Sequence, residues 1–185
     1  DWVDSFHNGF AVVVLNNKYN FIDAQCNMLS NQWFDWVGCF NDGFAVVILN
    51  DKYNFIDTQG NMLSNQWFND AWGFNDGFAM VKLNNQWNYI DTKGNMLSNQ
   101  WFDSAWNFNN GFAAIKLNDK WNFIDTQGNM LSNQWFDWAW DFNDGFARVV
   151  LNNKYNFIDA QCNMLSNQWF DDAWSFNDGF AAVKL

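Results

Sequence analysis

One feature, a verbatim internal repeat, limits the folds open to this chain more than any other. The eight residues NMLSNQWF recur letter for letter every 34 residues, at 27–34, 61–68, 95–102, 129–136 and 163–170. A fixed period of this length is typical of a supersecondary unit that buries its apolar face against the next copy. The chain therefore divides into repeats 1–34, 35–68, 69–102, 103–136 and 137–170, followed by the partial repeat 171–185.

Composition supports a folded array and narrows its partners. Hydrophobic residues make up 49% of the chain and aromatic residues 21%, whereas disordered repeats lack the apolar side chains that offset ordering entropy. The net charge of −11 argues against nucleic acid, which is bound by basic surfaces, and against anionic membrane surfaces. No run of apolar residues is long enough for a transmembrane segment.

Turn signals indicate strands and not helices, although 34 residues is also the period of helical tetratricopeptide repeats. In repeat 35–68 the turns are Asn41-Asp42-Gly43, Asn50-Asp51 and Asp57–Gly60. The segments between these turns are too short for helices, and β-branched and aromatic residues are common in them. The sequence predicts strands at 43–49, 52–57 and 61–68.

Variation between copies predicts which face of the first strand is buried. The positions of Ala45, Val47 and Leu49 stay small or aliphatic in every copy. The intervening position of Val46 becomes Met80, Ala114 and Arg148 in later copies. One constant and one variable set in alternation indicates a half-buried strand. We expect the variable set to face water.

These patterns predict an all-β protein. The preferred architecture is an open, solenoid-like superhelical array of three-stranded repeats. A closed, five-bladed ring resembling a β-propeller is the alternative, because the chain holds five full copies.

The repeat resembles the WG repeat, also called the KWG repeat. The family pattern F-x-x-G-L-A-x-V, G-K-W-G-[FY]-I-D-x-x-G and Y-D-x-A is matched by Phe74, Gly77, Ala79, Val81, Trp87, Tyr89, Ile90, Asp91, Gly94, Phe102, Asp103 and Ala105. One departure is Asn88, which stands where the family has Gly and is Asn in the other copies as well. The resemblance implies β-rich repeat modules with a binding or scaffolding role, and it supplies no catalytic residues.

A second, shorter resemblance bears on the class of ligand. Residues 52–67 (KYNFIDTQGNMLSNQW) are similar to the aromatic-rich choline- and glucan-binding repeats of cell-wall proteins. Those repeats are near twenty residues long, so the likeness indicates similar hairpin chemistry and not the same architecture.

Candidate catalytic and metal-binding residues are few. His7 is the single histidine and falls at a turn, without a partner that would orient it as a general base. The row of aspartates represented by Asp57 is expected to cap turns by accepting backbone N–H bonds. Cys26, Cys39 and Cys162 are expected to be free thiols. We therefore expect no enzymatic activity, no cofactor and no metal site.

The tryptophans fall into two classes. Those fixed in every copy are expected to be core residues: Trp33, Trp67, Trp101, Trp135 and Trp169. Others occupy positions that elsewhere hold Asp, Ser or Gly, and are expected to be at least partly exposed: Trp72, Trp106, Trp140, Trp174, Trp36 and Trp138. Packing between repeats is one role for this exposed class. The other is a row of flat platforms for ligand binding.

Two functions fit these features. The first is a non-enzymatic binding scaffold for a glycan or protein partner, on a cell or phage surface. The second is a structural segment of a fibre that self-associates end to end.

Overall fold

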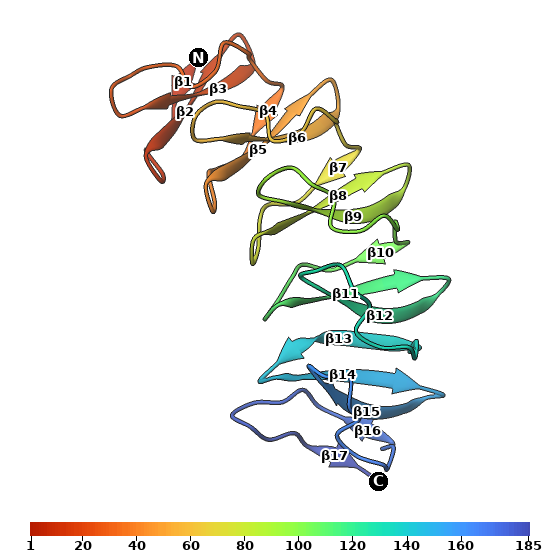
Figure 1. The fold of residues 1–185 in the computed structure, drawn as a ribbon. Helices are drawn as coiled ribbons and strands as arrows, with labels where there is room; N and C mark the ends of the chain where they lie inside the picture. Colours follow the sequence, from red (N-terminus) through yellow and green to blue (C-terminus); the bar gives the residue numbers. More distant parts are fainter. The chain divides into compact units, whose positions relative to one another are not determined.

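The computed structural model describes residues 1–185 and confirms an all-β chain of strands and turns without a helix (Figure 1). The first long strands of the repeats are β2 (Phe10–Leu15), β5 (Phe44–Leu49), β8 (Phe78–Leu83), β11 (Phe112–Leu117) and β14 (Phe146–Leu151). The second long strands are β3 (Lys18–Asp23), β6 (Lys52–Asp57), β9 (Gln86–Asp91), β12 (Lys120–Asp125) and β15 (Lys154–Asp159). The other strands are β1 (Trp2–Val3), β4 (Trp36–Val37), β7 (Asp70–Ala71), β10 (Ser104–Ala105), β13 (Trp138–Asn143), β16 (Asp172–Ala173) and β17 (Val183–Lys184).

These strands form antiparallel sheets that are all open. Five sheets have three strands, in orders such as β1-β2-β3 and β4-β5-β6, and β16 pairs with β17 alone. In the second sheet, Phe44 pairs with Asp57, and Trp36 of β4 pairs with Ile48 of β5. Each three-stranded sheet is thus a tight hairpin with a further strand at the edge of its first strand, and this further strand is short except for β13, which has six residues.

The prediction of a third strand at 61–68 is wrong. The backbone of this segment bridges to β6 only near its two ends, where Met62 and Phe68 form isolated bridges with Ile56 and Tyr53. Between the bridges, the Nδ2 of buried Asn54 donates to the Ser64 carbonyl at 2.7 Å. This bond holds the segment in a loop, because a side chain now occupies a carbonyl that a strand would pair through its backbone. The third strand is supplied instead by β4.

The predicted turns are confirmed by backbone geometry. Asn50 and Asp51 have φ values of 51° and 58°, the left-handed conformation that a two-residue type I′ hairpin turn requires at both positions. The Asp57 carboxylate accepts the N–H groups of Gln59 and Asn61 at 2.9 and 2.8 Å, as expected for a turn cap. Gly60 closes this loop with φ of 84°, and a Cβ there would lie 2.1 Å from the Leu29 carbonyl oxygen of the preceding repeat.

A phenylalanine interlock joins successive repeats. Phe74 stacks on Phe44 and meets the edge of Phe55, with ring centroids 4.6 and 5.2 Å apart. Phe142 makes the same contacts with Phe112 and Phe123, at 4.6 and 5.1 Å. Full burial of one such side chain contributes roughly 1.5–3 kcal/mol, so the repeated interlock is a main source of stability.

A row of buried asparagines accompanies this core: Asn20, Asn54, Asn88, Asn122 and Asn156, all fully buried. In most copies the side chain donates to a loop carbonyl ten residues ahead and accepts the next N–H, as Asn54 does from Phe55 at 2.8 Å. Buried amides are tolerated when both ends are hydrogen-bonded. These residues stand where the WG pattern has glycine, so the departure noted at Asn88 fixes the loop that follows.

The expectation that the Val46 position faces water is wrong in two copies. Met80 and Ala114 at this position are only 7% and 0% exposed. Ala114 lies in a core cluster against which Trp106 packs. Tryptophan side chains cover this face of the sheet, so both faces of the first strand are at least partly buried.

Contacts group the chain into two compact bodies. The first body comprises residues Asp1–Asn85 and Tyr89–Met96, and the second comprises Gln86–Asn88 and Leu97–Leu185. Each contains the same hairpin, loop and phenylalanine interlock.

Candidate functional site: an aromatic groove in the first body

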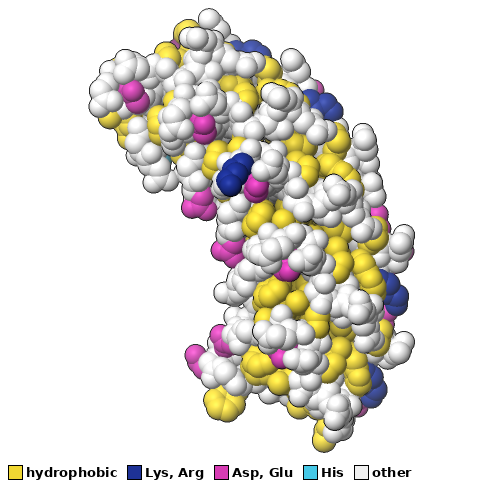
Figure 2. All heavy atoms as spheres, in the orientation of Figure 1, with side chains coloured by type: hydrophobic (Ala, Val, Ile, Leu, Met, Phe, Trp, Pro, Cys, Tyr) yellow, Lys and Arg dark blue, Asp and Glu magenta, His cyan; other side chains and the backbone are white.

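The variable tryptophans reach the surface to different degrees. Trp72 and Trp174 are 54% and 53% exposed, and Trp36 and Trp138 are 45% and 40% exposed. Trp106 and Trp140 are half-buried. Hydrophobic side chains at the surface of both bodies are visible in Figure 2, where basic side chains are few.

The fixed tryptophans are half-buried, so their assignment to the deep core is wrong. In the first four copies the residue that follows takes the interior position, since Phe34, Phe68, Phe102 and Phe136 are fully buried, whereas Phe170 is partly buried. Trp67 packs against the margin of a core cluster and not within it. In an extended segment successive side chains point to opposite sides, so only one of the Trp-Phe pair can enter the core.

Two successive repeats of the first body enclose an open groove of about 500 Å³. Its residues come from β4, β5 and β6 of one repeat and from β7 and the following residues of the next. Those that define its shape are Trp36, Gly38, Val46, Tyr53, Ala71 and Trp72. The volume lies within the range of about 300–1,000 Å³ that is usual for ligand sites.

Gly38 gives the groove one of its walls. A Cβ atom at Gly38 would lie 3.3 Å from Cη2 of Trp36, so the Trp36 ring lies against bare backbone at this point. Val46 is a short side chain on the neighbouring strand and leaves the space in front of the ring open. Apart from the indole N–H groups of Trp36 and Trp72, Tyr53 and Cys39 supply the polar side-chain atoms of a mainly apolar lining.

The corresponding positions in the second body are filled. Trp140 stands where the first body has Gly38, and Arg148 stands where it has Val46. The Arg148 guanidinium lies 3.7 Å from the centroid of the Trp140 ring and 5.9 Å from that of Tyr155. It also donates from Nη1 to the Ala173 carbonyl. Burial lowers the pKa of Arg148, and the nearby Tyr155 and Asp172 act in the opposite direction.

The structure therefore brings five of the six predicted site residues together in two groups, and Trp174 is exposed at the surface. Trp36 and Trp72 line one groove, whereas Trp138 and Trp140 lie in contact with centroids 6.1 Å apart. Trp106 packs edge-on against Trp121 and Trp138, at 5.7 and 6.5 Å. Sequence reasoning missed Gly38, Val46 and Tyr53. Gly38 and Val46 could have been found from the sequence, because these small residues are replaced by Trp140 and Arg148 at the same positions of the fifth repeat.

The pattern for the WG containing repeat matches residues 1–19, 34–53, 55–87, 89–121, 123–155 and 170–185. The chain belongs to the WG-repeat family. None of the curated proteins matches it.

Solved structures similar to these WG repeats have low sequence identity. The structure of KlHsv2 with loop 6CD replaced by a Gly-Ser linker matches 85% of this chain and 63% of its own, at 11% identity and a TM-score of 0.46. Kluyveromyces lactis Hsv2p matches 99% of this chain and 71% of its own, at 8% identity and 0.46. The N-terminal domain of Nup159 matches 98% and 60%, at 12% identity and 0.45. The WG repeats thus span less than two thirds of the first of these chains.

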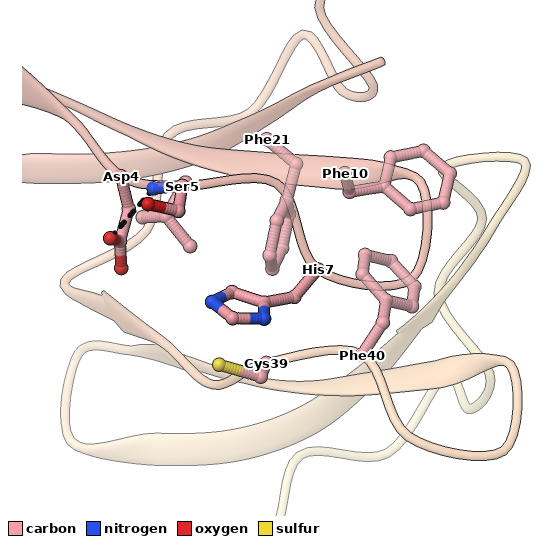
Figure 3. Close-up of a pocket in the computed structure, with 8 residues that line it drawn as sticks. Asp4, Ser5, His7, Phe10, Phe21, Cys39 and Phe40 are labelled. Atoms are coloured by element: carbon pink, nitrogen blue, oxygen red, sulfur yellow. Dashed lines mark hydrogen bonds between the residues drawn. The ribbon is translucent and has the colours of Figure 1, made fainter. Parts of the chain in front are cut away.

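A second pocket surrounds His7 in the first WG repeat, beside Cys39, Phe10, Phe21 and Phe40 (Figure 3). Its volume of about 10 Å³ is about that of a single water site. The His7 backbone exchanges hydrogen bonds with Phe10 at 2.8 and 3.1 Å, which places His7 in a turn as expected. The pocket is too small for an organic ligand.

The aspartates of the WG repeats are occupied by local hydrogen bonds. The side chain of Asn27 donates to Asp23, and this bond, with the backbone N–H groups of Asn27 and Gln25, lowers the pKa of that carboxyl. Asn163 lowers the pKa of Asp159 in the same way. The structure offers no helix that could span a bilayer. Cys26, Cys39 and Cys162 are free thiols.

Proposed function

We propose that this WG-repeat protein is a non-enzymatic binding module whose site is the groove of the first body between Trp36 and Trp72. One observation carries the proposal. The groove of about 500 Å³ is open and flanked by two tryptophans that are 45% and 54% exposed. Large exposed aromatic surfaces next to a cavity are typical of interaction sites, because an occupant removes their apolar area from water.

The chemistry of the groove supports binding and not catalysis. Its lining is aliphatic and aromatic, with Tyr53 and Cys39 as polar side chains. Acid–base catalysis needs a titratable group held by a second, orienting group, and the groove residues offer no such pair. The Asp57-type carboxylates are engaged by their own turns.

A ligand screen by nuclear magnetic resonance tests the proposal. The intact chain is labelled with nitrogen-15, and the indole signals of Trp36 and Trp72 are assigned from the variants Trp36→Phe and Trp72→Phe. Mono- and disaccharides, short peptides of each charge type and aromatic fragments are then titrated. We expect at least one class to shift both indole signals in a saturable manner. If no class shifts them, the groove is not a binding site.

The same samples measure the alternative role. Sedimentation velocity over a dilution series reports whether the chain self-associates. Binding at the groove should be independent of protein concentration. A groove signal that shifts on concentrating the protein alone would instead show that a second copy is the partner, as the fibre hypothesis expects.

A further inference from the structure

The second body shows which side chain can occupy the place that is an open groove in the first body. Four groove positions carry the same residue in both bodies: Trp36 and Trp138, Tyr53 and Tyr155, Ala71 and Ala173, Trp72 and Trp174. The preceding acid is also shared, since Asp70 and Asp172 each accept the following alanine N–H at 2.9 Å. These residues of the frame are therefore the same, and the largest differences are at the positions of Gly38 and Val46.

In the second body a guanidinium group occupies the corresponding space. Arg148 stacks over Trp140 at 3.7 Å, lies within 5.9 Å of Tyr155 and donates to the Ala173 carbonyl. The Asp172 carboxylate also favours the charged form of Arg148. Aromatic faces, a carbonyl and a nearby carboxylate are the partners that a planar guanidinium requires when it leaves water.

The first body keeps Tyr53, Ala71 and Asp70 at the positions of Tyr155, Ala173 and Asp172, and it lacks both the arginine and the ring at the Trp140 position. Val46 ends short of the space that Arg148 fills. Gly38 replaces Trp140, and the Trp36 ring lies against the bare backbone there, 3.3 Å from a Cβ position. An aromatic ring therefore remains at this wall, Tyr53 and Ala71 line the same groove, and Asp70 directly precedes Ala71 in the chain.

We propose that the groove between Trp36 and Trp72 binds an arginine side chain of a protein partner, in the way that the second body binds its own Arg148. This inference rests on the proposed function and names the class of partner. The incoming guanidinium would stack on the Trp36 ring and donate to the Ala71 carbonyl, with Asp70 and Tyr53 nearby.

The lining favours a guanidinium over a sugar. A sugar ring carries several hydroxyl groups, and each hydroxyl that is buried without a partner is costly. The groove offers mainly Trp, Gly, Val, Ile and Ala side chains, with Tyr53 and Cys39 as the polar exceptions. A guanidinium gains from the aromatic rings themselves, because its flat faces stack on them, while its N–H groups can donate to the Ala71 carbonyl and to water in the open groove.

The charge of the chain favours the same partner. The net charge is −11, with 20 acidic and 9 basic residues. Such a surface attracts basic segments and accelerates their association at low salt. An arginine-bearing segment thus fits the aromatic groove and carries a charge opposite to that of the chain.

The test uses the intact chain and two pentapeptides, acetyl-Gly-Gly-Arg-Gly-Gly-amide and the same peptide with citrulline, which has the shape of arginine without its charge. The indole signals of Trp36 and Trp72 report binding. We expect the arginine peptide to bind at least about tenfold more tightly than the citrulline peptide, and more weakly at high salt. The difference corresponds to about 1.4 kcal/mol.

Three variants locate the effect. Trp36→Ala removes the stacking ring, and Val46→Arg supplies an internal arginine as in the second body. Each should weaken peptide binding at least about tenfold. Trp2→Ala is the matched control, because Trp2 occupies the same repeat position as Trp36 and is 51% exposed but lies outside the groove. It should leave binding unchanged. Circular dichroism checks that each variant is folded.

A fourth variant asks whether the second body can become a site. Arg148→Ala empties the space beside Trp140 and Tyr155, so the arginine peptide should now shift the Trp140 indole signal as well. This arm does not depend on variants of the first body, and it keeps the inference testable if one of them fails to fold.

The outcomes separate the inference from the proposed function. Saccharide binding at Trp36 and Trp72 without arginine binding would overturn the inference and leave the binding module intact. Equal affinity for the two peptides would overturn it as well, because the groove would then not distinguish the charged guanidinium from neutral citrulline. Loss of binding in Trp2→Ala would show that the peptide binds exposed tryptophans in general and would contradict a site in the groove. A screen without any ligand would refute both proposals.

Discussion

The two bodies present the same face of the same repeat in opposite states. In the first body the face is hollow, because Gly38 and Val46 leave about 500 Å³ open beside Trp36 and Trp72. In the second body Trp140 and Arg148 occupy those positions, and the guanidinium stacks on the indole at 3.7 Å.

The comparison shows where function can vary in such an array. The two bodies share the phenylalanine interlock, the buried asparagine and the type I′ turns, because every repeat needs them to fold and to pack on the next repeat. The side chains at the positions of Gly38 and Val46 are not needed for this. A change at these two positions turns a packed surface into an open groove without altering the fold.

The largest expected effect tests whether the two bodies have equivalent cores. Phe74→Ala and Phe142→Ala each remove a ring that locks two repeats, and both rings are almost fully buried. We expect each change to lower the free energy of unfolding by about 3–5 kcal/mol, as is usual for core phenylalanines. Urea denaturation followed by tryptophan fluorescence measures both. Very different losses would mean that the two cores are not equivalent.

A second test removes a buried amide from each body. Asn54→Ala leaves the Ser64 carbonyl and the Phe55 N–H without their partner, and Asn156→Ala does the same to Ser166 and Phe157. We expect a loss of about 2–4 kcal/mol in each case, since two buried polar groups are stranded. Gln66→Ala, at an exposed loop position, is the control and should change stability by no more than about 0.5 kcal/mol. Thermal or urea unfolding that treats Asn54→Ala like this control would contradict the role of the amide.

A third test addresses the filled groove directly. Arg148→Ala removes a stacked cation and a hydrogen bond to Ala173. We expect a loss of about 1–3 kcal/mol in urea denaturation. Val46→Ala at the same repeat position should cost less, because only part of a small, half-buried side chain is removed. Equal losses would show that Arg148 contributes through its alkyl chain alone.

Much of the repeat could be predicted from local chemistry. Asn50-Asp51 marks a two-residue turn, because few residues other than Gly, Asn and Asp adopt positive φ readily. The structure confirms strand 52–57 as predicted and strand 43–49 to within one residue. The family pattern was also recognisable, since its spaced Gly, Asp and aromatic residues recur in every copy.

The errors arose where long-range contacts override the local pattern. Segment 61–68 has the composition of a strand, but the Asn54 amide, ten residues earlier, captures the Ser64 carbonyl. β4 is two residues long, too short to show a period. Constancy of Trp67 suggested a core residue, whereas its neighbour Phe68 is the one that is buried. Each error required knowing which face of one segment meets another.

The groove could not be predicted for a related reason. Its walls come from two successive repeats, and no sequence pattern places Ala71 and Trp72 opposite Val46 and Tyr53. The arginine at position 148 was evidence for a solvated face when judged by residue type. The structure shows it stacked on Trp140 and donating to the Ala173 carbonyl, with its Nε buried without a hydrogen-bond partner.

The smallest expected effect is a difference in pH dependence at the position next to Trp140. Asp141 occupies the place of Cys39 in the first body, and its Oδ1 is buried without a hydrogen-bond partner. Burial raises the pKa of Asp141 above its ordinary value of 3.8. The folded chain therefore holds this proton more tightly than the unfolded chain, and the stability that Asp141 contributes falls as pH rises from about 3.8 through the raised pKa.

Asp141→Asn removes this titration and leaves the other carboxylates in place. The lowered pKa values of Asp137, Asp159 and Asp171 act in the opposite sense, because their stabilisation is lost as pH falls, but they are common to both proteins. The free energy of unfolding of the variant, minus that of the parent, should therefore rise as the pH increases above about 3.8 and level off once the pH exceeds the raised pKa of Asp141. Urea denaturation at a series of pH values measures this difference. A flat difference would show that the Asp141 carboxylate is solvated, and that the space beside Trp140 is as open to water as the groove of the first body.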